Sequence, residues 1–238
     1  MRRYSIYLLD ADETLFDFRR AEREALRKVF AAHGFPFGEG VLEQYREINE
    51  ALWRALERGE TTKDQLQVER FVQLFQQIGH TADPEQIGRE EYPEALAEGN
   101  FLLPDALDVC RELSGTSTLY LTTNGITRVQ KQRLRESELA SYITDIFVSE
   151  EAGAAKPQKA YFDYVFLQIG LKDRSQALIV GDSLTSDIAG GANAGIDSCW
   201  LNPEGRPRRG GIAPVWEIRS LRELLSGEEG SFKAGHNF

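Results

Sequence analysis

Residues 6–14 read IYLLDADET, a short apolar run that ends in two carboxylates two residues apart. An apolar run of this length, bounded by polar residues, is typical of a buried strand. Ligands of an open parallel sheet bind outside the carboxyl ends of its strands, so Asp10 falls where catalytic side chains of α/β proteins collect. We expect Asp12 and Thr14 just past the strand, on a turn that lets both carboxylates face one ligand.

Two carboxylates at this spacing repel each other, and something must compensate their charge. A divalent cation such as Mg²⁺, which prefers oxygen ligands, meets this need. The alternative is a plain strand followed by an Asp-rich cap of the next helix. The rest of the chain has to decide between the two interpretations.

Chain length and net charge limit the number of domains and the kind of partner that this protein can have. The chain has 238 residues, of which 41% are apolar, enough for one large domain or two small ones with a sizeable core. Its net charge of −10 argues against a nucleic acid polymer as partner. A small anionic substrate stays compatible with this charge, because a metal and one or two cations can reverse the sign locally.

The remaining composition predicts a cytoplasmic protein. Cys110 and Cys199 are the two cysteines and lack metal-ligand spacing, so we expect buried thiols in a reducing compartment. No stretch is apolar for long enough to predict a membrane span. Asp10 and Asp12 interrupt the first apolar run too early for a signal peptide.

Residues 17–98 carry helical signals and no strand signal. Apolar side chains recur there with helical spacing, which predicts amphipathic helices. These helices are expected over 19–33, 39–57 and 66–78, with a shorter fourth helix from Asp83-Pro84. Thr62 followed by Gln65 is typical of a capping box at the start of the third helix.

From residue 101 onward, strand-like runs alternate with helical ones. The strands are expected at 117–122, 142–148, 177–180, 197–201 and 215–218. This alternation favours parallel pairing and a doubly wound sheet. We therefore predict an α/β fold with a core from residues 1–16 and 99–225, an inserted all-helical domain at 17–98, and a flexible tail at 226–238.

Polar residues follow the other strands as they follow the first. Thr123 and Asn124 precede a helix, where a hydroxyl, an amide and backbone N–H groups suit a phosphate oxygen. Lys156 supplies a cation, and Asp182 and Asp187 flank another helix start. Each has an ordinary alternative as a cap, a solvated lysine or a carboxylate at a helix terminus. Together they form a set with the chemistry of a phosphate site.

The set resembles the motifs of the haloacid dehalogenase-like (HAD) phosphohydrolase superfamily. The four motifs read DADET (10–14), TNG (123–125), KP (156–157) and GDSLTSD (181–187). The helical insertion at 17–98 is similar to the cap domain of that superfamily. The resemblance covers nearly the whole chain except the tail, and it implies a Rossmann-like HAD core with a helical cap.

The resemblance also implies a role for each motif residue. Asp10 would be the nucleophile that takes the phosphoryl group as an aspartyl-phosphate. Asp12 would protonate the leaving alcohol and then deprotonate the attacking water. Thr123 and Lys156 would hold the phosphoryl oxygens, with Asn124 beside them at the substrate.

The same resemblance implies a metal site. Asp182, the Asp10 side chain and the Asp12 backbone carbonyl would coordinate Mg²⁺, and Mn²⁺ is an alternative with the same ligand preference. Asp187 would act through the water shell of the metal or by orienting Lys156.

Details of the motifs point to a branch of the superfamily. Its dehalogenases lack the second aspartate, so Asp12 favours a phosphatase, with a phosphomutase as alternative. The stretches DADETLFDF (10–18), TTNGI (122–126) and SEEAGAAKP (149–157) are similar to bacterial noncanonical pyrimidine 5′-nucleotidases, as are GANAGI (191–196) and CWLN (199–202). This resemblance implies UMP, dUMP, dTMP and their noncanonical analogues as substrates. Phosphoglycolate or a sugar phosphate is the alternative.

Two further interpretations concern aromatic and histidine side chains. Phe16, beside the first motif, is a candidate to stack on a substrate base. His33, His80 and His236 lie near no motif, and we expect them at the surface and not on a metal.

Rival classes remain open on the residues alone. A phosphoryl-accepting receiver domain also uses an Asp, a metal, a hydroxyl and a Lys, but it is about half as long and lacks a helical insertion. An inactive scaffold on the same fold is a second rival. We expect a monomer or homodimer whose partner is a small phosphorylated substrate.

Overall fold

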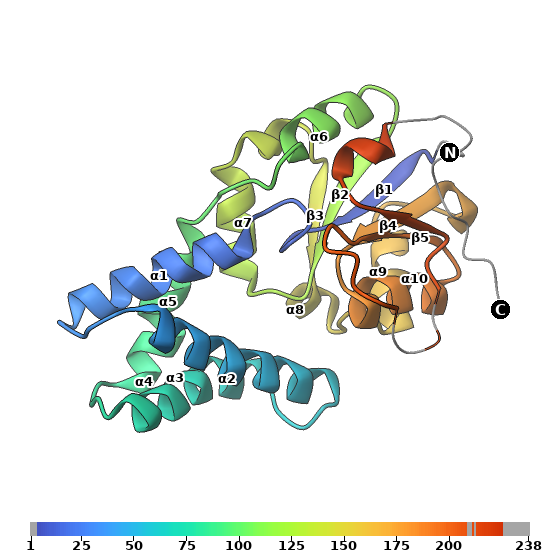
Figure 1. Ribbon diagram of the computed structural model, residues 1–238. Coiled ribbons are helices and arrows are strands. Elements are labelled where there is room, and N and C mark those ends of the chain that lie inside the picture. Colours follow the sequence, from blue (N-terminus) through green and yellow to red (C-terminus); the bar gives the residue numbers. More distant parts are fainter. Residues whose placement is uncertain (1–3, 209–210, 212, 226–238) are drawn as a thin grey trace. The chain divides into compact units, whose positions relative to one another are not determined.

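The computed structural model describes residues 4–208, 211 and 213–225. The chain forms two compact units (Figure 1), one from residues 1–18 and 100–238 and the other from residues 19–99. The tail predicted for 226–238 lies outside the described residues. Among the described helices, none has the length and apolar character that a membrane span requires.

The first unit is built on a six-stranded sheet in which every neighbouring pair is parallel. Its strands are β1 (Ile6–Asp10), β2 (Thr118–Thr123), β3 (Asp145–Val148), β4 (Ala177–Gly181), β5 (Asp197–Leu201) and β6 (Trp216–Ile218). They lie in the order β3-β2-β1-β4-β5-β6. The strand order reverses between β1 and β4, and such a switch point is where doubly wound sheets bind ligands. The predicted α/β class is confirmed.

Helices cover both faces of this sheet (Figure 1), because side chains of a strand point alternately to opposite faces. Tyr7 and Leu9 pack in one core with α6 (Ala106–Ser114) and the 3-10 turn Leu221–Leu224. Leu8 packs in a second core with α9 (Lys159–Gln168). The remaining helices are α7 (Thr127–Arg135), α8 (Ser149–Ala152) and α10 (Ala189–Ala194), which follows a π-helical turn at Leu184–Ile188. Cys110 and Cys199 are buried free thiols, as predicted.

The second unit is helical throughout. It contains α1 (Phe18–Ala32), α2 (Glu39–Glu57), α3 (Lys63–Ile78), α4 (Pro84–Gln86), a π-helical turn (Ile87–Glu91) and α5 (Tyr92–Ala97). The predicted capping box is confirmed, since Thr62 and Gln65 exchange hydrogen bonds at the start of α3. Three aromatic rings, Tyr45, Phe71 and Tyr92, contact one another in its core.

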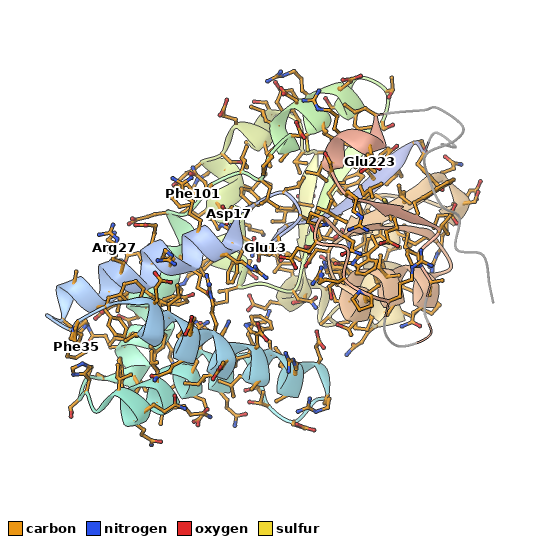
Figure 2. The ribbon with its side chains drawn as sticks, viewed as in Figure 1. Glu13, Asp17, Arg27, Phe35, Phe101 and Glu223 are labelled. Atoms are coloured by element: carbon orange, nitrogen blue, oxygen red, sulfur yellow. The ribbon has the colours of Figure 1, made fainter. Side chains whose placement is uncertain are left out.

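Within the first unit, the chain segments that lead to and from the helical unit lie side by side. The backbone N–H of Asp17 donates to the carbonyl of Phe101 at 2.9 Å, and both residues are labelled in Figure 2. The N–H of Leu103 donates to the carbonyl of Leu15 at 2.9 Å, and Phe16 bridges to Leu102. These bonds brace the segment that directly follows the first motif.

Candidate active site

The carboxyl ends of β1, β2 and β4 bring the predicted site residues of the sheet unit together. Asp10 ends β1 and is in register with Thr122 of β2, while Asp182 directly follows β4. Lys156 comes from the loop between α8 and α9. Residues more than a hundred positions apart thus meet at one edge of the sheet, because parallel strands end on the same side.

Lys156 lies at the centre of the cluster and is buried. Its Nζ donates to Asp10 Oδ1 at 2.6 Å, to Asp187 Oδ1 at 2.7 Å and to the carbonyl of Thr122 at 3.0 Å. Burial acts to lower the pKa of Lys156, but Asp10 and Asp187 outweigh it, and the pKa rises above its ordinary value. The lysine therefore remains a cation. All three of its protons are used in these bonds, so it would hold a phosphoryl oxygen in exchange for one of these acceptors.

Asn124 holds the backbone of Lys156. The N–H of Lys156 donates to Asn124 Oδ1 at 2.9 Å, and Asn124 Nδ2 donates to the carbonyl of Lys156 at 2.8 Å. Both polar groups of the Asn124 side chain are used in this way. In this structure the side chain therefore positions the loop that carries the lysine, and a contact of Asn124 with substrate stays a prediction.

Three carboxylates meet beside the lysine. Asp10, Asp182 and Asp187 each offer an oxygen, and these atoms lie within 4.8 Å of one another. The pKa of Asp10 is raised by burial, which outweighs the opposing effect of Lys156. Burial, and then the charge of Asp187, raise the pKa of Asp182 to about 7. Three carboxylates against one lysine leave an excess of negative charge, so the donor set fits a divalent cation with oxygen ligands.

Residues next to the three carboxylates hold them in place by hydrogen bonds and close contacts. Asp187 accepts a 3.2 Å bond from the N–H of Ser183 and so holds the turn after β4. A Cβ atom at Gly181 would lie 2.2 Å from Asp187 Oδ2, so only glycine allows this approach. Thr14 donates its hydroxyl to Asp10 Oδ2 at 3.0 Å. Thr14 lies on the predicted turn, and its position four residues after Asp10 was the one local signal for this bond.

Thr123 is buried at the end of β2. Its Oγ1 accepts a 3.0 Å bond from the N–H of Gly125. Since the hydroxyl accepts in this bond, its own proton is left to donate to a phosphoryl oxygen. This placement is compatible with the substrate contact that we predicted for Thr123.

The Asp12 carboxylate does not belong to the cluster of three carboxylates and bonds to other side chains. Its Oδ1 accepts a bond from Arg133 Nη1 at 2.5 Å, and its Oδ2 accepts one from Gln130 Nε2 at 2.7 Å. This carboxylate is not in the group of side chains that could hold a metal ion. The expected metal ligand from this residue is its backbone carbonyl and not its side chain. Gln130 and Arg133 were not among the predicted site residues, although two polar side chains three residues apart on one helix were a signal.

Phe16 does not have the position that we predicted. Its ring is fully buried in the core of the sheet unit, and the guanidinium of Arg133 lies 4.7 Å from the ring centroid. A ring covered on all sides cannot stack on a substrate base, so this prediction is wrong. Phe16 is held by the turn after Asp12, because its backbone N–H donates to the carbonyl of Ala11 at 2.8 Å.

The described histidines belong to the helical unit. His33 Nε2 lies 2.6 Å from Glu91 Oε2, and the rings of His33 and His80 stack on Phe35, which is labelled in Figure 2. Neither lies in the group of potential metal ligands found among the described residues. His236 lies outside the described residues.

From the carboxylate cluster we predict that the stabilisation of the folded protein by Mg²⁺ depends on pH. The folded state binds a proton on Asp182 more tightly than the unfolded chain, because its pKa rises from 3.8 to about 7. Without metal, the free energy of unfolding should therefore fall as the pH rises between these two values. Mg²⁺ needs the deprotonated carboxylates, so it should raise the melting temperature more at about pH 8 than at about pH 5.

Thermal unfolding followed by circular dichroism, with EDTA or with Mg²⁺, measures both effects. Asp182→Asn should flatten the pH dependence and remove most of the stabilisation by Mg²⁺. An equal effect of Mg²⁺ at both pH values in the wild type would contradict a metal site at Asp182.

Comparison with known proteins agrees with this geometry. The haloacid dehalogenase-like hydrolase family matches residues 4–195. The chain is 43% identical over 224 residues to the HAD-hydrolase YfnB of Bacillus subtilis, which covers 94% of this chain and 95% of that protein. It is 38% identical over 215 residues to the pyrimidine 5′-nucleotidase YjjG of Escherichia coli, covering 90% and 93% of the two chains. A crystal structure of YfnB bound to magnesium has a TM-score of 0.89 at 42% identity and covers 94% of this chain and 98% of that chain.

Proposed function

The chain belongs to the haloacid dehalogenase-like hydrolases and is a phosphatase, and we propose that it hydrolyses pyrimidine nucleoside 5′-monophosphates with Mg²⁺ through an aspartyl-phosphate on Asp10. The observation that carries this proposal is the setting of Asp10. Its two carboxylate oxygens accept bonds from Lys156 and Thr14, and two further carboxylates lie beside it. Such a group is held in place before the reaction begins, which is what phosphoryl transfer requires.

In the first step, a carboxylate oxygen of Asp10 bonds to phosphorus while the bond from phosphorus to the ester oxygen breaks. The ester oxygen keeps the electron pair and takes a proton from Asp12, so the nucleoside leaves as an alcohol. Lys156 and Thr123 hold the phosphoryl oxygens as charge builds up on them. When bound by Asp10, Asp182 and the Asp12 carbonyl, Mg²⁺ would offset the charge of the phosphoryl group.

In the second step, Asp12 removes a proton from a water molecule whose oxygen attacks phosphorus. The bond between phosphorus and Asp10 breaks, and the Asp10 carboxylate is restored as inorganic phosphate leaves. Asp12 ends the cycle protonated, as it began. The presence of Asp12 supports hydrolysis of an ester over dehalogenation, because a halide leaving group needs no proton.

The substrate class rests on relatives. Besides YjjG, the pyrimidine 5′-nucleotidase PynA of Streptococcus pneumoniae is 35% identical over 223 residues, covering 93% of this chain and 94% of that protein. The match therefore extends through the helical unit as well as the sheet unit. An identity of 35% and 38% to two pyrimidine 5′-nucleotidases over this extent favours a pyrimidine nucleotide over phosphoglycolate or a sugar phosphate.

Phosphate release from a panel of phosphomonoesters tests the proposal. We expect kcat/KM for UMP, dUMP and dTMP to exceed that for AMP, GMP, phosphoglycolate and glucose 6-phosphate by about tenfold or more, a difference of about 1.4 kcal/mol in transition-state binding. EDTA should abolish release, and added Mg²⁺ should restore it. A preference for phosphoglycolate or a hexose phosphate would overturn the nucleotide substrate and leave the chemistry of Asp10 in place.

A further inference from the structure

Both oxygens of the Asp12 carboxylate are occupied by side chains of one helix. Arg133 Nη1 donates to Oδ1 at 2.5 Å and Gln130 Nε2 donates to Oδ2 at 2.7 Å, both from α7. Residues three positions apart lie on the same face of a helix, so the two donors reach Asp12 together. The Asp12 side chain keeps 26% of its surface exposed, whereas that of Arg133 is fully buried.

The two donors are themselves fixed by packing. The guanidinium of Arg133 lies over the ring of Phe16, 4.7 Å from its centroid, in a cation–π contact. Gln130 packs against the turn after β2, since a Cβ atom at Gly125 would lie 2.4 Å from its Nε2. A buried charge is costly unless it is paired, so the full burial of Arg133 is compatible with a fixed bond to Asp12.

We propose that Arg133 and Gln130 are positioning residues for Asp12, which hold the plane of its carboxylate for proton transfer. The proposal rests on the role of Asp12 in the proposed function. A group that transfers protons must present a lone pair or a proton to the reacting oxygen within hydrogen-bond reach. A carboxylate can accept about four hydrogen bonds, so these two donors leave lone pairs for the leaving oxygen and for the attacking water.

Arg133 also has a charge of the right sign for the first step. As Asp12 gives its proton to the leaving oxygen, negative charge develops on the carboxylate 2.5 Å from the guanidinium nitrogen. An interaction that strengthens as this charge develops lowers the barrier of the step. Its benefit should depend on the leaving group, because only a poor leaving group needs the proton.

The test compares kcat/KM for UMP with that for 4-nitrophenyl phosphate, because this ratio reports the steps up to release of the leaving group. Arg133→Met should lower kcat/KM for UMP by about 100-fold, the scale of one removed charge-stabilising donor. The value for 4-nitrophenyl phosphate, whose leaving group departs without a proton, should fall less than about threefold. Gln130→Met should show the same selectivity with a smaller loss, and Arg133→Lys should recover part of the UMP activity.

Two controls separate positioning from support of the fold. Arg135→Met removes an exposed arginine of the same helix and should leave both activities unchanged. In an Asp12→Asn background, Arg133→Met should cost less than about twofold further, because residues that act through one group are not additive. Circular dichroism measures whether each variant is folded. Gln130→Met, which removes no charge, continues the test if Arg133→Met does not fold.

Equal losses with both substrates, or a full further loss in the Asp12→Asn background, would overturn the proposal. A failure of this proposal can be distinguished from a failure of the proposed function. If wild type prefers another alkyl phosphate to UMP, the same comparison is made with that substrate and still tests Arg133. If Asp12→Asn itself shows no dependence on the leaving group, the role of Asp12 fails, and the proposal for Arg133 fails with it.

Discussion

Asp10→Asn is expected to lower kcat by about 10⁴-fold or more, the scale of losing a nucleophile that forms a covalent intermediate. An amide has no carboxylate oxygen to bond phosphorus, so the aspartyl-phosphate cannot form. Phosphate release in the presence of Mg²⁺ measures the loss. Acid quenching with labelled substrate should trap phosphate on the wild-type peptide that contains Asp10, and none on the variant.

The fold of this variant should remain intact. Asn has nearly the shape of Asp and can still accept the bond from Thr14. Lys156 keeps its bonds to Asp187 and to the carbonyl of Thr122. Burial opposes a charge on Asp10, so removal of that charge offsets part of the lost ion pair, and the melting temperature should change by about 4 °C or less.

A surface substitution provides the matched control. Asp163→Asn weakens surface ion pairs with Lys159 and Arg174 and should leave kcat unchanged. Activity of Asp10→Asn within about tenfold of wild type would contradict a nucleophilic Asp10. A large loss together with a collapsed melting temperature would instead indicate a structural cause.

Asp12→Asn is expected to separate the two chemical steps. With 4-nitrophenyl phosphate, the first step needs no proton from Asp12, so about one equivalent of nitrophenol should appear in a burst. Hydrolysis of the aspartyl-phosphate should then be slower by about 10² to 10⁴-fold, because water lacks its base. With UMP as substrate, no burst of released nucleoside should appear, since the departing 5′-oxygen needs the proton that Asn cannot supply.

Stopped-flow absorbance at the start of the reaction measures the burst, and acid quenching measures the phosphorylated protein. Wild type is the control, and the fraction of protein that is phosphorylated at steady state should be smaller in wild type than in Asp12→Asn. Normal turnover of UMP by Asp12→Asn would contradict the acid and base role. So would equal losses with both substrates and no phosphorylated protein, which would indicate that Asp12 supports Asp10 and not proton transfer.

Local patterns were sufficient to predict the architecture. Runs of apolar residues ended at polar ones where β1 and β4 end, and helical stripes ended at glycines such as Gly79, which adopts a left-handed backbone. The capping box of Thr62 and Gln65 was readable because its partners are three residues apart. Each of these features depends on neighbours within one or two turns of chain.

The details of the site could not be read in this way. Lys156 meets Asp10 across 146 positions of sequence, and Arg133 meets Asp12 across 121. The bonds of the Asn124 side chain to the backbone of Lys156, 32 positions away, could not be predicted from the sequence. Phe16 looked accessible beside its motif, and the turn after Asp12 buries it.

The sequence by itself determined the parallel α/β core, the helical insertion and the order of the four motifs, because periodicity and turn chemistry are local. Only the tertiary structure decided which oxygens Lys156 bonds and which side chains hold Asp12. Those partners are set by strand register and by the face that each helix presents, and such contacts join residues that no local pattern connects.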